Sequence, residues 1–155
     1  MKRIVLTLLS VVFMILGTSC TQTVKIDDVS LDANSVAEIL VTEMEFSEEL
    51  TKISSNVLAK RYGLDEEMLT DAVGYAGTRA VVDEITVFKS NDTDAVLEAA
   101  RAHIDAQIKN YTSYAPNEVP KLNDAAIEVI GDCVIVCVSK SDSAVVKSII
   151  GALAE

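Results

Sequence analysis

The clearest hairpin in this chain is predicted at residues 126–139, AIEVIGDCVIVCVS. The stretch reads as a strand at 126–130, a two-residue turn, and a second strand at 133–139. Two-residue turns join antiparallel neighbours and set their register. Because side chains alternate between the two faces of a sheet, one face is predicted to be wholly apolar core and the other to be mixed. The core face carries Ile127, Val129, Val134, Val136 and Val138, and the mixed face carries Glu128, Ile130, Cys133, Ile135 and Cys137.

Helices are predicted on both sides of this hairpin in the sequence. A long helix at about 93–114 precedes it, with Asp92 or Thr93 as its cap and two prolines after its end. Apolar side chains recur along this helix at spacings of three and four, which is typical of a helix with one buried face. A final helix at about 142–154 follows the hairpin.

Two more strands are predicted at 69–76 and 84–89, as antiparallel neighbours. Together with a short helix at 55–62, they give an order in which N-terminal helices precede a ββαββα pattern. This order predicts a single α+β domain over residues 35–155. Its expected architecture is a four-stranded, mainly antiparallel sheet with helices packed on one face.

Residues 1–20 have the layout of a bacterial export signal. Two basic residues precede an apolar run at 4–16, and three small residues lead to Cys20. Signal peptides have this order of regions, and the run is shorter than the roughly 20 residues that a spanning helix needs. A cysteine at this point indicates a lipoprotein, in which residues 1–19 are removed and Cys20 is acylated, for example with palmitate. The predicted location is the extracytoplasmic face of the cell membrane, held by this lipid anchor.

One residue of the signal departs from the usual lipoprotein pattern. Gly17 stands where an aliphatic residue is preferred. Cleavage by the ordinary signal peptidase, with Cys20 left free, and an uncleaved anchor are therefore the alternatives.

The segment after the cysteine lacks periodicity. Residues 20–34 are predicted to be the lipidated N-terminus and a flexible tether. A helix at about 36–45 then begins at a capping box formed by Ser35 and Glu38.

The charge of the chain argues against nucleic acid as a partner. Acids outnumber Lys and Arg by 24 to 13, and removal of Lys2 and Arg3 with the signal takes the formal net charge from −11 to −13. Binding to nucleic acid depends on Lys and Arg side chains that neutralise phosphates. The chain has no tryptophan and few aromatic residues, so an aliphatic core is expected.

The cysteines and the single histidine give no metal site. Cys133 and Cys137 are four residues apart on one predicted strand, about 13 Å between Cα atoms, whereas a disulfide spans at most about 7 Å. We expect both to be small buried apolar residues. With His103 as the one histidine of the sequence, a Cys/His zinc site lacks ligands. No cofactor, metal or catalytic residue is predicted.

Three features of the sequence are candidate sites: His103, the acidic run Asp65–Glu67, and Gly74 beside Tyr75. His103 lies at the edge of the long helix's apolar stripe and is interpreted as an ordinary boundary histidine. Asp65–Glu67 could offer oxygens to calcium, but the run lacks the spacing of a calcium loop and is interpreted as a solvated helix start. Gly74 beside Tyr75 indicates either a bend in the strand or a close approach by another segment or ligand.

Several short runs also stand in a characteristic order along the chain. They are Arg61-Tyr62-Gly63-Leu64-Asp65, Val73-Gly74-Tyr75-Ala76, Asp83-Glu84-Ile85-Thr86-Val87-Phe88-Lys89, Gln107, Tyr114 and Pro116 to Leu122. With this set, residues 35–154 resemble the small exported lipoproteins of Gram-positive anaerobes that contain domain of unknown function 4358. The resemblance implies a lipid-anchored extracytoplasmic domain. It implies no activity and no catalytic residues.

Two binding functions are expected ahead of an enzymatic one. The first is a non-enzymatic module that binds a protein or another envelope component through the mixed sheet face around Ile135, if helices leave that face exposed. The alternative is a small-ligand-binding lipoprotein with a pocket near Tyr75 and Tyr114. An envelope hydrolase would need an acid, base and nucleophile that the sequence does not bring together.

Overall fold

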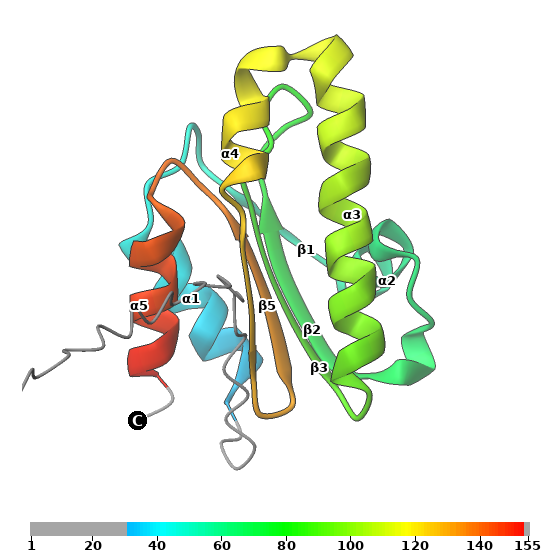
Figure 1. Cartoon of the computed structure of the whole chain (residues 1–155). Coiled ribbons are helices and arrows are strands. Elements are labelled where there is room, and N and C mark those ends of the chain that lie inside the picture. Colours follow the sequence, from blue (N-terminus) through cyan, green and yellow to red (C-terminus); the bar gives the residue numbers. More distant parts are fainter. Residues whose placement is uncertain (1–30, 154–155) are drawn as a thin grey trace, which may run out of the picture.

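Five strands form one antiparallel sheet in the order β1-β2-β3-β5-β4 in the computed structural model, which describes residues 31–153 (Figure 1). The strands are β1 (Thr51–Ile53), β2 (Leu69–Ala76), β3 (Glu84–Ser90), β4 (Ala126–Ile130) and β5 (Cys133–Val138). Both strands of the predicted hairpin are present, and their register is confirmed, with Ile130 opposite Cys133 and Val129 opposite Val134. The turn between them uses Gly131 at φ 55°, a conformation that glycine adopts without steric cost.

Residues 31–153 also form five α-helices, which surround this sheet. They are α1 (Ala33–Glu43), α2 (Ser55–Tyr62), α3 (Thr93–Tyr114), α4 (Val119–Asn123) and α5 (Ser143–Ala152), with short 3₁₀ turns at Glu66–Met68 and Pro116–Glu118. The long helix has the predicted bounds, and Asp92 caps it by accepting a hydrogen bond from the backbone N–H of Ala95.

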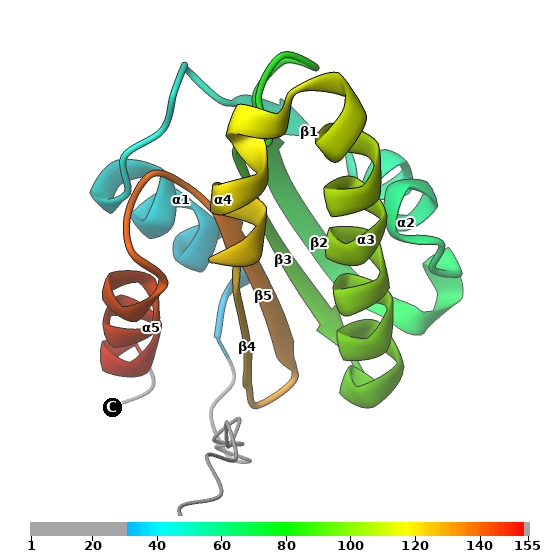
Figure 2. The ribbon, with the colours of Figure 1, turned by 45° about the horizontal axis from the view of Figure 1, so that its top comes forward.

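Helices cover both faces of the sheet, so the prediction of helices on one face is wrong. The helices α1 and α5 lie on one side, and α2 and α3 lie on the other (Figure 2). The reason is that the strands are apolar on both faces: Ile135 and Cys137 point toward α1 and α5, whereas Val134 and Val136 point the other way. A face of this kind is stable only when another element removes it from water.

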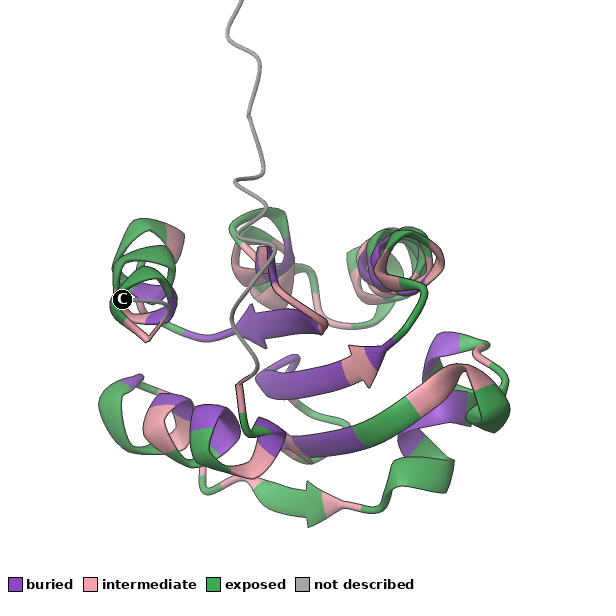
Figure 3. Cartoon of the chain, turned by 90° about the horizontal axis from the view of Figure 1, so that it is seen from below, coloured by how far each residue is buried: buried purple, intermediate pink, exposed green. Residues whose placement is uncertain are grey.

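Two hydrophobic cores result, one on each side of the sheet. Buried residues concentrate on the strands and on the inward sides of the helices (Figure 3). The first core includes Val36, Leu40, Ile85, Val87, Ile135, Cys137, Val146 and Ile150. The second includes Leu58, Phe88, Val96, Leu97, Ile104, Leu122, Val129, Val134 and Val136.

The sheet has one strand more than the four predicted. Residues Thr51–Ile53 form β1, which pairs antiparallel with β2 so that Lys52 lies opposite Tyr75. Three residues, two of them exposed, are too short to show the alternation that identifies a strand from sequence.

The first helix begins earlier than predicted. Asp32 caps α1 by accepting a hydrogen bond from the backbone N–H of Ser35 at 2.8 Å. The predicted capping box of Ser35 and Glu38 is therefore wrong, because both residues lie inside the helix, and α1 starts within the stretch 20–34 that was expected to be a tether.

Gly74 marks a close approach of α2 to β2. A Cβ atom at this position would lie 2.7 Å from Cδ2 of Leu58 and 3.2 Å from the carbonyl oxygen of Ile85. Of the two interpretations of this glycine, the structure supports contact with another segment. The shift in strand register lies elsewhere, between Leu69 and Asp71.

Candidate functional site

A cavity of about 630 Å³ opens between α3 and the connection from β2 to β3. Five parts of the chain line it: α2, the end of β2, the connection at 77–83, the start of β3, and the C-terminal half of α3. Its lining includes Arg61, Gly77, Thr78, Arg79, Val81, Asp83, Glu84, His103, Ala106, Gln107, Asn110, Tyr111 and Tyr114. Small-molecule sites in proteins fall in this range of volume.

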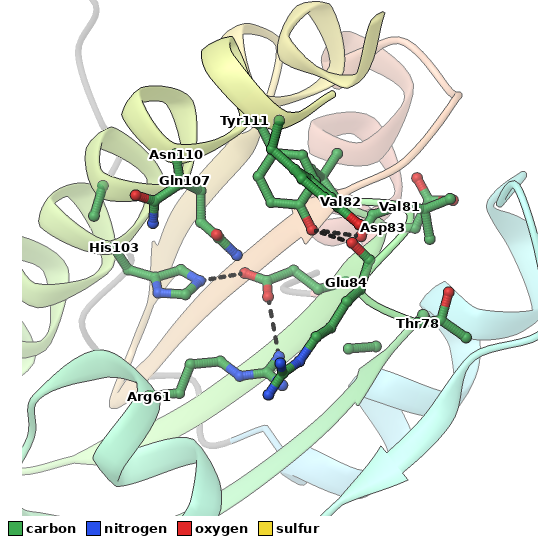
Figure 4. A pocket seen from close by; sticks show the side chains of 15 residues that line it. Arg61, Thr78, Val81, Val82, Asp83, Glu84, His103, Gln107, Asn110 and Tyr111 are labelled. Carbon is green, nitrogen blue, oxygen red and sulfur yellow. Dashed lines mark hydrogen bonds and ion pairs between the residues drawn. The ribbon is translucent and has the colours of Figure 1, made fainter. Parts of the chain in front are cut away.

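A buried carboxylate lies at the inner end of this cavity. Glu84 is the first residue of β3 and is 3% exposed. Its Oε1 accepts a hydrogen bond from the Tyr62 hydroxyl at 2.7 Å and lies 3.1 Å from Nε2 of His103, and its Oε2 lies 3.5 Å from a guanidinium nitrogen of Arg61. Figure 4 shows the Glu84 carboxylate between His103 and Arg61.

These contacts decide the charge state of Glu84. Burial alone would raise its pKa, but the hydrogen bonds with His103 and Tyr62 and the charge of Arg61 outweigh burial and lower the pKa below its ordinary value. Glu84 is therefore ionised at neutral pH.

Tyr62 and His103 hold this carboxylate from two helices. Their rings stack with centroids 4.1 Å apart, and the Tyr62 ring meets Phe88 edge-on at 4.8 Å. Burial, followed by the adjacent charge of Glu84, raises the pKa of Tyr62 well above its usual value. The Tyr62 hydroxyl therefore stays protonated and acts as a donor.

The connection at 77–83 forms one wall of the cavity and is tied to α3. The hydroxyl of Tyr111 donates toward the carbonyl oxygens of Arg79 and Val81, both at 3.1 Å. The backbone N–H of Val82 donates to Glu118 at 3.1 Å, and the N–H of Thr78 donates to Glu48. These bonds hold the wall in place beside α3.

A second network fixes the base of the same connection. Nζ of Lys121 lies 2.7 Å from Oδ1 of Asp83 and 2.6 Å from Oε2 of Glu118. The other oxygen of Asp83 accepts a hydrogen bond from the backbone N–H of Ser47. Although desolvation lowers the pKa of Lys121, its bonds with Asp83 and Glu118 raise it overall, so the side chain is charged.

One face of α3 presents polar side chains to the cavity. His103, Gln107, Asn110, Tyr111 and Tyr114 follow one another at helical spacing and all line it (Figure 4). Because α3 rises about 1.5 Å per residue, this row extends roughly 16 Å along the helix. The row therefore presents imidazole, amide and phenol groups to the cavity.

The structure changes the interpretation of His103 and of the predicted tyrosine pocket. His103 is not an ordinary boundary residue, since its side chain is 7% exposed and contacts Glu84 and Tyr62. Tyr114 does line the cavity, but Tyr75 does not. Tyr75 points to the opposite face of the sheet, toward the core under α1, with Nζ of Lys52 at 5.7 Å from its ring centroid.

The mixed sheet face is not available as a surface. Ile130, Cys133, Ile135 and Cys137 are each at most 4% exposed, beneath α1 and α5. Partner binding through this face was expected only if helices leave it exposed, and that condition is not met. Both cysteines have free thiols, and burial raises the pKa of each to about 12.

The acidic run Asp65–Glu67 forms the start of a 3₁₀ turn, as expected. Asp65 caps it by accepting from the backbone N–H of Glu67 at 3.1 Å. Within residues 31–153, no group of three or more His, Cys, Asp or Glu side chains is placed to hold a metal ion. In the same range, no helix combines the length and the apolar character needed to cross a membrane. Cys20, the predicted lipidation site, lies outside the described residues.

Sequence reasoning did not identify the residues around Glu84 as a site. Two signals were present: a glutamate on the same strand face as Phe88, and the alignment of His103 with Gln107 and Tyr111 on one helical face. Neither signal reveals that α2 brings Arg61 and Tyr62 to the same place. Arg61, Tyr62, Glu84, Gln107 and Tyr114, which belong to the runs on which the family resemblance rests, all lie at or beside the cavity.

Comparison with known proteins identifies a family without a described activity. The family model described as "Domain of unknown function (DUF4358)" matches residues 29–139. No curated protein and no solved structure matches the chain.

Proposed function

The chain belongs to the family defined by a domain of unknown function (DUF4358), and we propose that its domain binds a small ligand, without catalysis, in the cavity beside α3. The observation that carries this proposal is the cavity itself, about 630 Å³, with polar and aromatic side chains directed into it from three or more elements. The hydrogen-bonded wall at 77–83 supports it, because a wall that is already fixed costs a ligand little ordering.

The chemistry of the lining favours binding over reaction. No serine or cysteine is among the described residues that line the cavity, and the Thr78 hydroxyl accepts a hydrogen bond from the backbone N–H of Ala80. Nε2 of His103 is already engaged by Glu84. Nucleophilic catalysis needs an activated nucleophile beside its base, which this lining does not provide.

We also propose that the domain works as an extracytoplasmic lipoprotein attached to the membrane through Cys20. This part rests on the sequence of residues 1–20. Intact-mass and peptide mass spectrometry of the protein from the membrane fraction should give Cys20 as the first residue, with a mass increase that corresponds to acylation. An unmodified N-terminus would contradict the lipid anchor and leave the ligand proposal untouched.

Ligand binding can be tested with a variant that fills the cavity. Ala106 is exposed on α3 and lines the cavity, so Ala106→Trp should close it without disturbing the core. Ala102, also exposed on α3 and outside the lining, gives the matched control Ala102→Trp. The full-length lipoprotein, purified in mild detergent, would be incubated with a small-molecule extract of the cell envelope, dialysed, and examined by native mass spectrometry.

The two variants give opposite expectations. Wild type and Ala102→Trp should retain the same bound mass, whereas Ala106→Trp should retain none. Retention of that mass by Ala106→Trp, or no bound mass in any of the three proteins, would overturn the proposal.

A further inference from the structure

The arginines of this acidic chain gather at the cavity. Residues 31–153 contain three arginines, Arg61, Arg79 and Arg101, and the first two line the cavity. They come from different elements, α2 and the connection at 77–83, and the fold places both at the lining of one cavity. In a chain where acids outnumber bases by 24 to 13, this placement concentrates positive charge at one opening.

The guanidinium groups have unused donors. Arg61 has one ion-pair contact in the described part of the chain, with Glu84 at 3.5 Å, and its side chain is 34% exposed. Arg79 is exposed and has no side-chain partner among the residues that the structure describes. A guanidinium group carries five N–H donors in a planar arrangement that matches carboxylate and phosphate oxygens.

The carboxylates at the cavity, by contrast, already have their partners. Glu84 accepts from Tyr62 and contacts His103 and Arg61. Asp83 is bound by Lys121 and by the backbone N–H of Ser47, and its side chain has no exposed surface. Among the described residues that line the cavity, the guanidinium groups therefore have free donors whereas both carboxylates are engaged, which suits a ligand that carries an anionic group.

We propose that the ligand of this cavity is a small ring-bearing organic anion whose carboxylate or phosphate group binds Arg61 and Arg79. This inference rests on the function proposed above. The ring contacts Tyr114, whose side chain is 69% exposed at the end of the α3 row and meets Tyr111 edge-on at 5.8 Å. Gln107 and Asn110, between the two ends, supply amide groups that both donate and accept.

Three probes of similar shape separate charge from size. Benzoate carries a carboxylate, phenyl phosphate carries a phosphate, and benzamide replaces the anion by a neutral amide. Their affinities for the full-length lipoprotein in detergent would be measured by ligand-observed saturation-transfer NMR. We expect benzoate or phenyl phosphate to bind about tenfold more tightly than benzamide, because charge-assisted bonds are roughly twice as strong as neutral ones. The stronger of the two identifies the anionic group.

Three variants, each of which replaces one arginine by glutamine, test where the anionic probe binds. Arg61→Gln and Arg79→Gln should each weaken binding of the anionic probe about fivefold or more, whereas Arg101→Gln, on the exposed face of α3, should leave it unchanged. Arg61→Gln also removes a contact with Glu84, and circular dichroism would show whether this variant still folds. If it does not fold, Arg79→Gln alone tests the proposal.

The outcomes also separate this inference from the proposed function. If benzamide binds as tightly as benzoate, and Ala106→Trp abolishes both, the cavity is a ligand site and the anion inference is wrong. The anion inference is also wrong if Arg79→Gln and Arg101→Gln weaken binding of the anionic probe equally. It is wrong as well if the probe binds Ala106→Trp as tightly as wild type, since the probe then binds outside the cavity. If the molecule retained from the envelope extract is neutral, the proposal of ligand binding stands and the inference of an anionic ligand is wrong.

Discussion

Glu84 is the residue on which the site depends most. It is a charged side chain at the start of a strand that is almost wholly buried, and it is tolerated there because three partners surround its oxygens. A buried charge without such partners would cost several kcal/mol. The carboxylate in turn orients His103 and Arg61, which line the cavity, so this one residue connects the stability of the fold to the shape of the cavity.

Removal of this charge should destabilise the protein and change its response to acid. For Glu84→Gln we expect a loss of about 2–4 kcal/mol in the free energy of unfolding at pH 7, because charged hydrogen bonds are lost in a buried setting. The pKa of Glu84 is lower in the folded chain than its ordinary value of 4.5. Its stabilisation is therefore complete above about pH 4.5 and is lost as the pH falls through the folded-state pKa.

Urea denaturation followed by circular dichroism at pH 7, 5, 4 and 3 measures both effects. Glu98→Gln, on the exposed face of α3, is the control and should stay within about 0.5 kcal/mol of wild type. An acid dependence in Glu84→Gln as steep as that of wild type would show that other groups are responsible.

Among the elements, α4 is linked to the connection before β3 by an ion pair. Its Lys121 reaches Asp83, whose side chain is fully buried, and Ser47 in the segment after α1. We expect Lys121→Met to cost about 3 kcal/mol, because it leaves the Asp83 carboxylate buried without its cation. Addition of Asp83→Asn should recover part of this loss.

A double-mutant cycle in urea would measure the coupling between the two residues. Lys109→Met, at an exposed position of α3, removes the same charge without this network and should be nearly neutral. If the losses from Lys121→Met and Asp83→Asn simply add, the ion pair does not hold α4 in place.

The contact between α2 and β2 depends on the absence of a side chain at Gly74. An added Cβ would lie 2.7 and 2.9 Å from the two terminal carbons of Leu58. We expect Gly74→Ala to destabilise the protein by about 1–3 kcal/mol, as overpacking does. In a Leu58→Ala background the same change should cost much less, because the clash is gone.

Gly151 provides the control for this prediction. It lies in α5 with no atom within 4 Å of an added Cβ, so Gly151→Ala should be neutral or stabilise by up to about 1 kcal/mol. Thermal melts of the four variants are sufficient. Equal costs of Gly74→Ala with and without Leu58 would contradict the packing explanation.

At the scale of the whole molecule, the layer of α1 and α5 decides which side chains meet water. It covers Cys133 and Cys137 together with Ile135, and it converts a sheet with two apolar faces into the middle of three layers (Figure 3). The sheet face around Ile135, which was expected to bind a partner if it stayed exposed, is covered by this layer.

The two buried thiols report on this layer. Burial raises the pKa of both to about 12, so at pH 8 they should react with iodoacetamide only when the layer opens. Ile150→Ala, which weakens α5 by about 2–5 kcal/mol, should accelerate labelling strongly. Val145→Ala, at a position 49% exposed on the same helix, should not.

Peptide mapping follows Cys133 and Cys137 separately from other cysteines. Rapid labelling of both thiols in the folded wild type would mean that the second face is open in solution, contrary to the three-layer arrangement.

Local sequence patterns are sufficient to predict most of the elements and the central hairpin. Apolar periodicity placed α2, α3, β2, β3, β4 and β5 within a residue or so of their observed bounds, and the two-residue turn fixed the register of Val129 and Val134. These features depend on neighbours within about ten residues, which a sequence pattern contains. β1 was missed because three residues carry too little pattern, and the α1 cap was misplaced because Ser35 and Asp32 are both good caps.

The cover of each sheet face and the position of the site depend on tertiary packing, which local sequence patterns do not contain. The apolar pattern of Ile135 and Cys137 is the same whether a helix or a partner covers them, and only packing shows that α1 and α5 do so. Glu84 lies 23 residues after Arg61 and 19 residues before His103 in the sequence, and the three meet through the packing of α2, β3 and α3. Contacts between distant residues leave no local periodicity, so the cavity beside α3 belongs to the fold and not to any stretch of the sequence.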